Sequence, residues 1–396
     1  MKILELTVEG FRSLNNIYWR PGDLNVIIGP NGTGKSNLLR LLEFVSVSAN
    51  GRLSKYVQSS EGIEPLLWDG RSSEISFSIE MSPLDGLVPL HNQTYRVELE
   101  RLGFGSDYRI RYEQLADYHL VHAGTKGNPF KHLERQYSTG RIFDEGDRAL
   151  IATEDEIVPD ELLLSQMSGL FINNKWIPAI RQYLSAWSVY HDLHVNRDAA
   201  IRQSVVARSE KRVAPDGQNL TSVLHTLYTG DRHFKQSINS AMRAAFGNDF
   251  DELIFPPAAD QRIQLRVRWK TLRNEQSAAD LSDGTLRFLF LLTVLGTPSP
   301  APLIAIDEPE TGLHPSMLPI VAEYAVDAAQ RSQVILTTHS DQLLDAFGDT
   351  RPTTTVAKWT DGETELATLD NNELAYWLKE YSLGALYRSR ELENMP

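Results

Sequence analysis

The strongest constraint in the sequence is a glycine-rich segment at residues 29–36, which reads Gly-Pro-Asn-Gly-Thr-Gly-Lys-Ser. It matches the phosphate-loop pattern in full. An apolar run at 24–28 precedes it and reads as a buried strand, and leucines at helical spacing follow it. Glycines let successive backbone N–H groups converge on phosphate oxygens, and the following helix points its positive end at the same anion. A glycine-rich turn without a ligand is the alternative, and we set it aside because eight residues match in a strand–loop–helix context.

The side chains of this segment, the phosphate loop, suggest its ligands. Lys35 is expected to reach the β- and γ-phosphates, and the Ser36 hydroxyl is expected to coordinate Mg²⁺. The predicted cofactors are therefore ATP and Mg²⁺. The residues expected to bind the nucleotide here are Asn31, Gly32, Thr33, Gly34, Lys35, Ser36 and Asn37.

A phosphate loop needs an acidic partner for the metal, and two carboxylates follow a second apolar run at 303–306. Asp307 is expected to hold Mg²⁺, directly or through water, and Glu308 to polarise the attacking water. His339 follows a third apolar run and is expected to sense the γ-phosphate. A histidine after a strand is usually structural, but its place behind the two carboxylates reverses that preference. Lys35, Glu308 and His339 are thus the predicted catalytic residues of an ATPase.

Spacing adds a further constraint, because 272 positions separate Lys35 from Asp307. A compact nucleotide-binding domain uses far fewer, so a substantial segment is inserted between the two motifs. Residues 281–287, Leu-Ser-Asp-Gly-Thr-Leu-Arg, precede an apolar helix upstream of the acidic strand. In this signature segment Ser282 and Gly284 offer a hydroxyl, a permissive backbone and a helix amino terminus aimed at an anion.

Read in order, these segments resemble the ABC-type ATPases of the SMC/RecF/OLD group. The resemblance includes Gly-Phe-Arg-Ser-Leu at 10–14 and Asp-Glu-Pro-Glu-Thr-Gly-Leu-His-Pro at 307–315, and it covers about 1–50 and 270–345. The signature segment departs from the usual Leu-Ser-Gly-Gly-Gln form at Asp283 and Thr285, in a way typical of this group.

The resemblance implies a head-to-tail ATP sandwich between two copies of the chain. Ser282, Asp283 and Gly284 of one copy would cap the γ-phosphate bound by the other, so that ATP closes a homodimer, or a larger oligomer, and hydrolysis reopens it. It also implies a nucleotide contact for Arg12. Gln166 is the candidate for the glutamine that links the nucleotide and its metal to the inserted arm, although Gln114 competes for that role.

We expect an α/β fold, a P-loop ABC-type head with an antiparallel β-subdomain and a central helical insertion. Strict alternation at 74–81, 95–100 and 108–112 predicts half-buried antiparallel strands. From 160 to 245 the pattern turns helical without a sustained heptad register, so a short lid replaces the long arm of SMC proteins. The predicted domains are 1–155 (first ATPase lobe with the β-subdomain), 156–250 (helical insertion) and 251–396 (second lobe).

Charge patterning raises two further questions. An acidic cluster from Asp144 to Glu161 lacks calcium-loop spacing and reads as a solvated loop. The run at 262–270 alternates, which puts Arg262, Arg266, Arg268 and Lys270 on one face of a predicted strand. Such a face can bind nucleic-acid phosphates, but a solvated outer face is the favoured interpretation. A second basic segment, with Arg197, Arg202, Arg208, Lys211 and Arg212, carries the same ambiguity.

Composition narrows the setting. The net charge of −13 confines any nucleic-acid contact to such local stripes, and the lack of cysteine excludes disulfides and thiolate zinc sites. We find no signal peptide and no apolar run long enough to span a membrane, so we expect a cytoplasmic protein. Only 56 residues follow Ser340, too few for the nuclease domain of OLD proteins.

The sequence therefore predicts an ATP-driven switch in genome maintenance or anti-phage defence that controls a separately encoded nuclease or toxin. The alternative is a RecF-type scaffold or nucleic-acid clamp that binds ATP with little turnover. The partner, the trigger, the choice between DNA and RNA, and the choice between repair and defence stay open.

Overall fold

The computed structural model describes the chain apart from residues 71, 85–90, 104–105, 118–128, 144–149, 153–156, 168–173, 192, 259–260 and 395–396. The chain divides into two compact units, each assembled from separate stretches of sequence. The first unit comprises Met1–Gly22, Ile28–Trp187 and Thr354–Thr368, and the second comprises Asp23–Ile27, Ser188–Thr353 and Leu369–Pro396.

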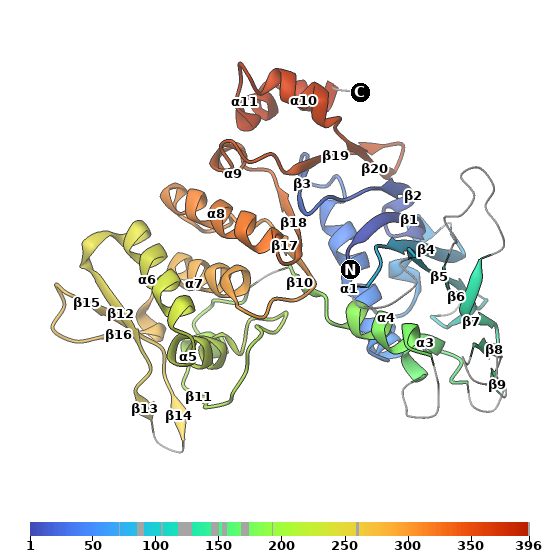
Figure 1. Ribbon diagram of the computed structural model, residues 1–396, viewed down its shortest axis with the longest axis horizontal. Helices are drawn as coiled ribbons and strands as arrows, with labels where there is room; N and C mark the ends of the chain where they lie inside the picture. The colour runs from blue at the N-terminus through green and yellow to red at the C-terminus, as the bar shows by residue number, and fades with distance from the viewer. Residues whose placement is uncertain are drawn as a thin grey trace. The chain divides into compact units, whose positions relative to one another are not determined.

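The first unit is built on an eight-stranded antiparallel sheet in the order β2-β1-β4-β5-β6-β7-β8-β9 (Figure 1). The strands are β1 (Ile3–Phe11), β2 (Leu14–Trp19), β4 (Glu74–Met81), β5 (Gln93–Arg101), β6 (Tyr108–Asp117), β7 (Phe130–Gln136), β8 (Thr139–Ile142) and β9 (Leu150–Ala152). The alternation predicted for β4 is confirmed, because its side chains are buried and half-buried in strict turn. A register shift between Glu98 and Leu99 interrupts the pairing of β5 with β6.

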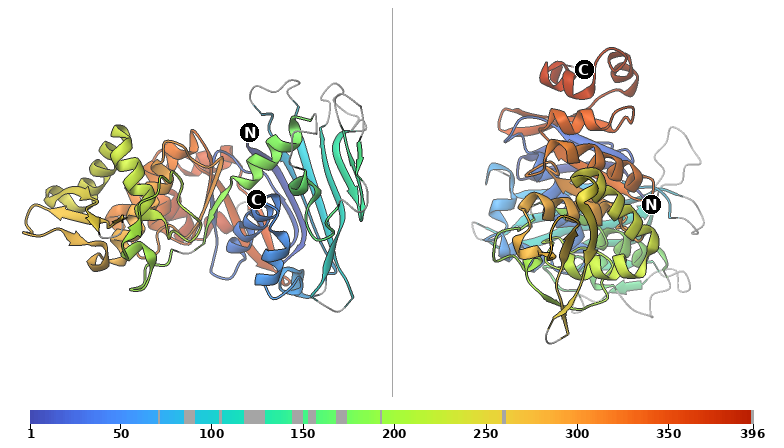
Figure 2. Two further views of the ribbon diagram at one scale, coloured as in Figure 1. Left: turned by 90° about the horizontal axis from the view of Figure 1, so that it is seen from below. Right: turned by 90° about the vertical axis from the view of Figure 1, so that its left-hand side faces the viewer.

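Helices cover one face of this sheet, as the left view of Figure 2 shows for α1 (Lys35–Ala49). Phe44 of α1 packs against Phe11 of β1 and Phe77 of β4, with ring centroids 5.6 and 6.3 Å apart. Each aromatic side chain buried in this way removes a large apolar area from water. The other helices of the unit are α2 (Leu53–Ser59), α3 (Leu163–Gln166) and α4 (Trp176–Ser185), and a hairpin of β19 (Thr353–Thr360) and β20 (Glu363–Thr368) completes it.

A buried carboxylate anchors α3 to the sheet. Glu113 of β6 accepts backbone N–H bonds from Leu163 and Leu164 at 2.6 and 2.8 Å, and the Tyr95 hydroxyl donates to it at 2.8 Å. Desolvation by burial raises the pKa of Glu113, and the two backbone bonds oppose that rise.

The second unit centres on four strands in the order β10-β17-β18-β3. These are β10 (Ser188–Tyr190), β17 (Leu303–Asp307), β18 (Gln333–Thr338) and β3 (Leu24–Ile28). β17 pairs in parallel with both β10 and β18. Every residue of β3 and β18 is buried, as expected for a parallel sheet covered on both faces.

The second unit also contains helices and two small sheets. Ten of the 14 residues of α7 (Asp283–Gly296) are buried, so this helix forms part of the core. The remaining helices are α5 (Leu220–Gly230), α6 (Arg232–Phe246), α8 (Leu318–Ala329), α9 (Asp341–Ala346), α10 (Asn371–Trp377), α11 (Leu383–Arg388) and α12 (Glu391–Asn394). The small sheets are β11-β14-β13 (Val205–Val206, Arg262–Ile263, Pro257–Ala258) and β12-β15-β16 (Phe250–Ile254, Arg266–Trp269, Gln276–Ser277).

The structure bears on two expectations from the sequence, one about membrane spans and one about the acidic cluster. None of the helices in the described part of the chain has the length and apolar character that crossing a membrane requires. Most of the acidic cluster at 144–161 lies outside the described residues, but Glu161 accepts N–H bonds from Leu53 and Ser54, both at 3.1 Å, at the start of α2.

Candidate nucleotide-binding site

The phosphate loop follows the buried strand β3 in the chain and leads into helix α1, and its residues belong to the first unit. Gly29, Gly32 and Gly34 all have positive φ values, of 150°, 85° and 90°. A Cβ atom on Gly29 would lie 2.4 Å from the Ala357 carbonyl oxygen, and one on Gly34 would overlap the Thr364 hydroxyl. The loop therefore requires glycine at these two positions for space as well as for backbone conformation.

The start of α1 has the features of an anion-binding helix terminus. Gly34 is its N-cap, and no side chain in the described part of the chain caps the helix. First-turn N–H groups that no side chain caps are suited to phosphate oxygens. Lys35 is buried, and its Nζ donates to the carbonyl oxygens of Gly29 and Pro30 at 2.7 and 3.0 Å. The Thr33 hydroxyl also donates to Pro30, at 2.9 Å, while Asn31 and Gly32 form the exposed tip.

Arg12 lies in the turn between β1 and β2 with a left-handed backbone, φ 49°. Its Nε is buried without a hydrogen-bond partner among the described residues. Burial, and then the positive charge of Arg40, lower the pKa of its guanidinium. A guanidinium in these surroundings would be stabilised by an anionic ligand.

In the second unit, β17 ends at Asp307, whose carboxylate accepts a hydrogen bond from the Thr337 hydroxyl of β18. The next residue, Glu308, has φ 44°. A left-handed non-glycine residue costs of the order of 1–3 kcal/mol and is a frequent mark of a functional site. Two bonds hold it there: the Glu308 N–H donates to the Thr337 carbonyl at 3.1 Å, and its own carbonyl accepts from Thr311 N–H at 3.0 Å.

His339 follows β18 and faces two carboxylates. Its Nδ1 lies 3.0 Å from Glu308 Oε1 and 3.8 Å from Glu310 Oε1. Glu310 Oε1 accepts bonds from the Thr338 hydroxyl at 2.5 Å and from the His339 N–H at 3.3 Å. Desolvation by burial raises the pKa of Glu310. Sequence reasoning missed Glu310, although it lies within the 307–315 segment.

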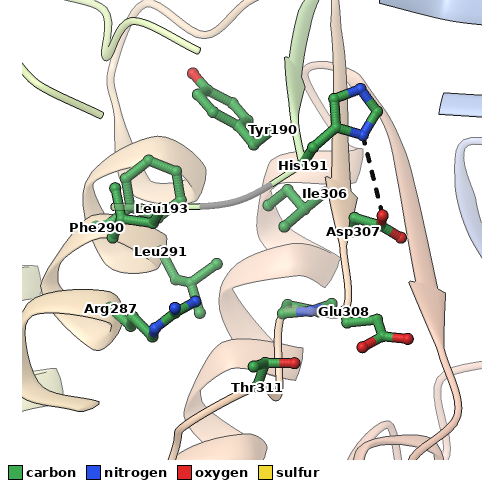
Figure 3. A pocket seen from close by; sticks show the side chains of 11 residues that line it. Tyr190, His191, Leu193, Arg287, Phe290, Leu291, Ile306, Asp307, Glu308 and Thr311 are labelled. Atoms are coloured by element: carbon green, nitrogen blue, oxygen red, sulfur yellow. Dashed lines mark ion pairs between the residues drawn. The ribbon is translucent and has the colours of Figure 1, made fainter. Parts of the chain in front are cut away.

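A small pocket of about 30 Å³ opens beside Asp307 and Glu308 in the same unit. Figure 3 shows its lining side chains, which include Tyr190, His191, Arg287 and Thr311. His191 Nδ1 lies 3.9 Å from Asp307 Oδ2. His191 follows β10, and sequence reasoning missed it because a single histidine after a three-residue strand carries no distinguishing pattern.

The signature segment begins α7. Ser282 is the N-cap, and its hydroxyl accepts the Thr285 N–H at 3.2 Å. Ser282 and Asp283 are exposed, whereas a Cβ on Gly284 would lie 2.7 Å from the Gly312 carbonyl oxygen. The amino terminus of α7 therefore presents Ser282 and Asp283 outward while its glycine packs on the 307–315 segment.

Arg202 fixes this segment from within. It is buried, and it donates to the carbonyl oxygens of Val195 and Leu281, both at 2.7 Å, and to that of Ala278 at 3.1 Å. It also pairs with Asp283. For Arg202, the ambiguity that the sequence left is resolved in favour of a structural role, because its guanidinium bonds to these carbonyls and to Asp283.

The predicted basic strand at 262–270 is also wrong as a single strand. Arg262 belongs to β14 and Arg266 and Arg268 to β15, which lie in different sheets. Arg268 pairs with Glu252 at 2.7 Å and Glu275 at 3.3 Å, which offsets its charge. Arg262 and Lys270 stay exposed and donate to backbone carbonyls.

Gln166 has a local role at the end of α3. Its amide oxygen accepts from Val158 N–H at 2.8 Å, and its amide nitrogen donates to the carbonyl oxygens of Val158 and Glu161 at 3.1 and 2.8 Å. These bonds hold a turn, so the prediction that Gln166 binds metal gains no support. No cluster of three or more potential metal ligands occurs among the residues that the structure describes.

The fold and these motifs define the class of the protein as an ABC-type, SMC-head-like P-loop ATPase. The chain belongs to the family described as "AAA domain, putative AbiEii toxin, Type IV TA system", whose model matches residues 24–345. No curated protein matches the chain.

Solved structures agree with the fold class. The chain resembles the SmcHead bound to the C-winged helix domain of ScpA, with a TM-score of 0.56 and 16% identity, over 95% of this chain and 100% of that one. It also resembles the Smc head domain with an extended coiled coil bound to the C-terminal domain of ScpA derived from Pyrococcus furiosus. There the TM-score is 0.54 and the identity 14%, over 96% of this chain and 99% of that one. At these identities the likeness shows the fold alone.

Proposed function

We propose that the chain binds and hydrolyses ATP as an ABC-type switch. The observation that carries this proposal is the geometry of Glu308, a left-handed residue whose carboxylate lies 3.0 Å from His339 Nδ1. A strained backbone that the adjacent strand stabilises is expected where a side chain must be aimed for chemistry. The carboxylate of the neighbouring Asp307 accepts from the Thr337 hydroxyl and not from His339, so the two carboxylates have different partners.

The phosphate loop supplies binding and charge stabilisation. Its glycines and the amino terminus of α1 receive the phosphates, and Lys35 exchanges its loop carbonyls for the β- and γ-phosphates. Arg12 and Asn37 would add further contacts to the nucleotide. Ser36 and Asp307 are the residues that would hold Mg²⁺, and a hydroxyl with a carboxylate is the oxygen donor set this ion prefers. When bound, Mg²⁺ neutralises charge that develops on the phosphates. Glu308 orients and deprotonates the attacking water, and His339 holds Glu308 in place.

We also propose that ATP closes a dimer through the signature segment. Support comes from the exposure of Ser282 and Asp283 at the amino terminus of a helix of 14 residues. That terminus carries a partial positive charge, suited to the γ-phosphate held by a second copy. Binding energy would then favour the closed state, and loss of the γ-phosphate would release it. The division into 1–155, 156–250 and 251–396 remains a prediction.

We propose that this ATPase controls a separately encoded nuclease or toxin in the cytoplasm. The setting would be anti-phage defence or genome maintenance. The family description, which names a toxin and a type IV TA system, supports the defence setting. A clamp with little turnover is the second candidate. The observation that favours it is the exposure of Arg197, Arg208 and Lys211, which are free to approach nucleic-acid phosphates.

Phosphate release by the wild type and by Lys35→Ala, with and without DNA or RNA, tests both candidates. A switch hydrolyses ATP in a manner that Lys35→Ala abolishes. A clamp binds ATP and retains nucleic acid with affinity that falls steeply with salt. A wild type that neither binds nor hydrolyses ATP would overturn both.

A further inference from the structure

A chain of hydroxyl groups lies beneath the phosphate loop. Thr364 of β20 donates its single hydroxyl proton to the Thr33 carbonyl oxygen at 2.9 Å. Its Oγ1 also lies 2.6 Å from Ser13 Oγ. Because a hydroxyl has one proton to donate, Ser13 must be the donor in that second bond.

Asn37 extends the chain, since its Nδ2 donates to Ser13 Oγ at 2.8 Å. The bonds therefore run in one direction, from Asn37 through Ser13 and Thr364 to the carbonyl of Thr33. Thr33, Ser13 and Thr364 are 5%, 8% and 2% exposed, so water competes little for these bonds. Successive hydrogen bonds of this kind polarise and strengthen one another.

Two tight turns bring these groups together. Arg12 at φ 49° precedes Ser13 in the turn between β1 and β2, and Asp361 and Gly362, at φ 51° and 92°, form the turn between β19 and β20. Thr364 N–H donates to the Ser13 carbonyl at 2.8 Å, and Asn15 donates to Glu363 at 2.7 Å. The position of the Thr364 hydroxyl is thus set by backbone and side-chain bonds.

The bonded carbonyl is the one that matters for phosphate binding. The peptide unit between Thr33 and Gly34 is planar, and in a trans peptide the carbonyl and the N–H point in opposite directions. A carbonyl of Thr33 that is held toward Thr364 therefore aims the Gly34 N–H away from β20. Gly34 is the N-cap of α1, and its N–H is among the donors that a phosphate loop offers.

We propose that Thr364 is a positioning residue for nucleotide binding, acting through the Thr33 carbonyl on the Gly34 N–H. The inference rests on the proposed ATP site and deepens it. Thr364 and Ser13 both lie outside residues 24–345, the stretch that the family model matches. The amino-terminal turn and the carboxyl-terminal hairpin thus orient a loop that neither of them contains.

Thr364→Val tests the proposal because it removes the hydroxyl and keeps the shape. We measure the Kd for a fluorescent ATP analogue and the KM and kcat for ATP. Loss of one buried hydrogen bond to the loop predicts binding weaker by about three- to tenfold. KM rises while kcat changes less than about twofold, because the oriented N–H binds ground and transition states alike. Thr364→Ser restores the wild-type KM.

Thr355→Val is the matched control. Thr355 is fully buried on β19 in the same hairpin, but its hydroxyl accepts from the Trp19 indole at 3.0 Å, away from the loop. It is expected to lower stability and leave KM unchanged. Ser13→Ala breaks the chain one step earlier and serves as a second variant if Thr364→Val does not fold; it too should raise KM.

The possible outcomes distinguish a failure of the positioning role of Thr364 from a failure of the proposed ATP site. A wild-type KM in Thr364→Val, or in Ser13→Ala where Thr364→Val does not fold, overturns the positioning role and leaves the ATP site standing. An equal rise of KM in Thr355→Val also overturns it, since the effect would then be general to the hairpin. Absence of ATP binding by the wild type overturns the proposed function and the inference together.

Discussion

Glu308 Oε1 lies 3.0 Å from His339 Nδ1, so the end of one parallel strand orients the carboxylate at the end of its neighbour. If Glu308 is the general base, Glu308→Gln keeps the size of the side chain and removes proton acceptance. We expect kcat to fall by about 10²- to 10⁴-fold, with ATP affinity nearly unchanged. Phosphate release and a fluorescent ATP titration measure the two quantities.

Glu310→Gln is the control for this prediction, because it makes the same change two positions away. A glutamine oxygen still accepts from Thr338, so the loss of kcat should be much smaller than that of Glu308→Gln. Equal losses in the two variants would contradict the assignment of Glu308.

Arg202 offers a second prediction, on stability. Arg202→Met leaves the carbonyls of Val195, Ala278 and Leu281 without their donor and Asp283 without its partner. Because Asp283 is exposed, most of the loss comes from the buried carbonyl acceptors, at about 1–3 kcal/mol each. We expect a total of about 3–5 kcal/mol in the free energy of unfolding, measured by urea titration. Arg212→Met removes an exposed arginine with two carbonyl contacts of 3.3 Å and should cost less than about 0.5 kcal/mol. A loss below about 1 kcal/mol in Arg202→Met would argue against its role in fixing the signature segment.

Ser282→Arg tests whether ATP closes a dimer through the signature segment. A long cation at the exposed start of α7 should block the approach of a second copy, while the phosphate loop of each copy still binds ATP. The variant also loses a helix cap, at a cost of about 1 kcal/mol. Ser382→Arg loses the equivalent cap of α11, where Ser382 accepts the Ala385 N–H at 3.2 Å, and should dimerise normally. Light scattering with ATP separates these outcomes, and a dimer of Ser282→Arg would exclude the trans arrangement.

The buried carboxyl group of Glu113 is expected to make the free energy of unfolding depend on pH. Burial raises its pKa above the ordinary value of 4.5, so the folded state favours the protonated carboxyl. The associated stability is fully present below the unfolded pKa and is lost as the pH rises through the folded pKa. Glu113→Gln lacks this titration. The free energy of unfolding of the wild type relative to Glu113→Gln should therefore fall from pH 4 toward neutral, and a difference that is independent of pH would contradict it.

The sequence predicted the parts of the fold that local pattern determines. The alternation of β4, the glycines of the phosphate loop and the carboxylates after β17 follow from period, turn chemistry and strand length. The sequence left the role of Arg202 open and predicted one strand at 262–270 where the structure has two, because a single sequence does not show which cations are bonded within the fold. The metal-binding role of Gln166 stays a prediction; the bonds of its side-chain amide to backbone groups of Val158 and Glu161 had no signal in the sequence.

Other site residues had no local signal at all. Thr364 acts on Thr33 across 331 positions, and His191 reaches Asp307 across a parallel strand pair. Contacts of this kind come from topology, which short-range pattern does not determine. Glu310 could have been predicted from the sequence, since its spacing from Glu308 puts both carboxylates in one turn after β17.

The most direct test of the ATP-driven switch is the mass of Glu308→Gln with and without ATP and Mg²⁺, measured by light scattering. We expect about 44.6 kDa without nucleotide and twice that value with ATP, since this variant binds ATP and does not hydrolyse it. A mass that stays the same with and without ATP, while the variant binds ATP, would contradict the ATP-driven switch.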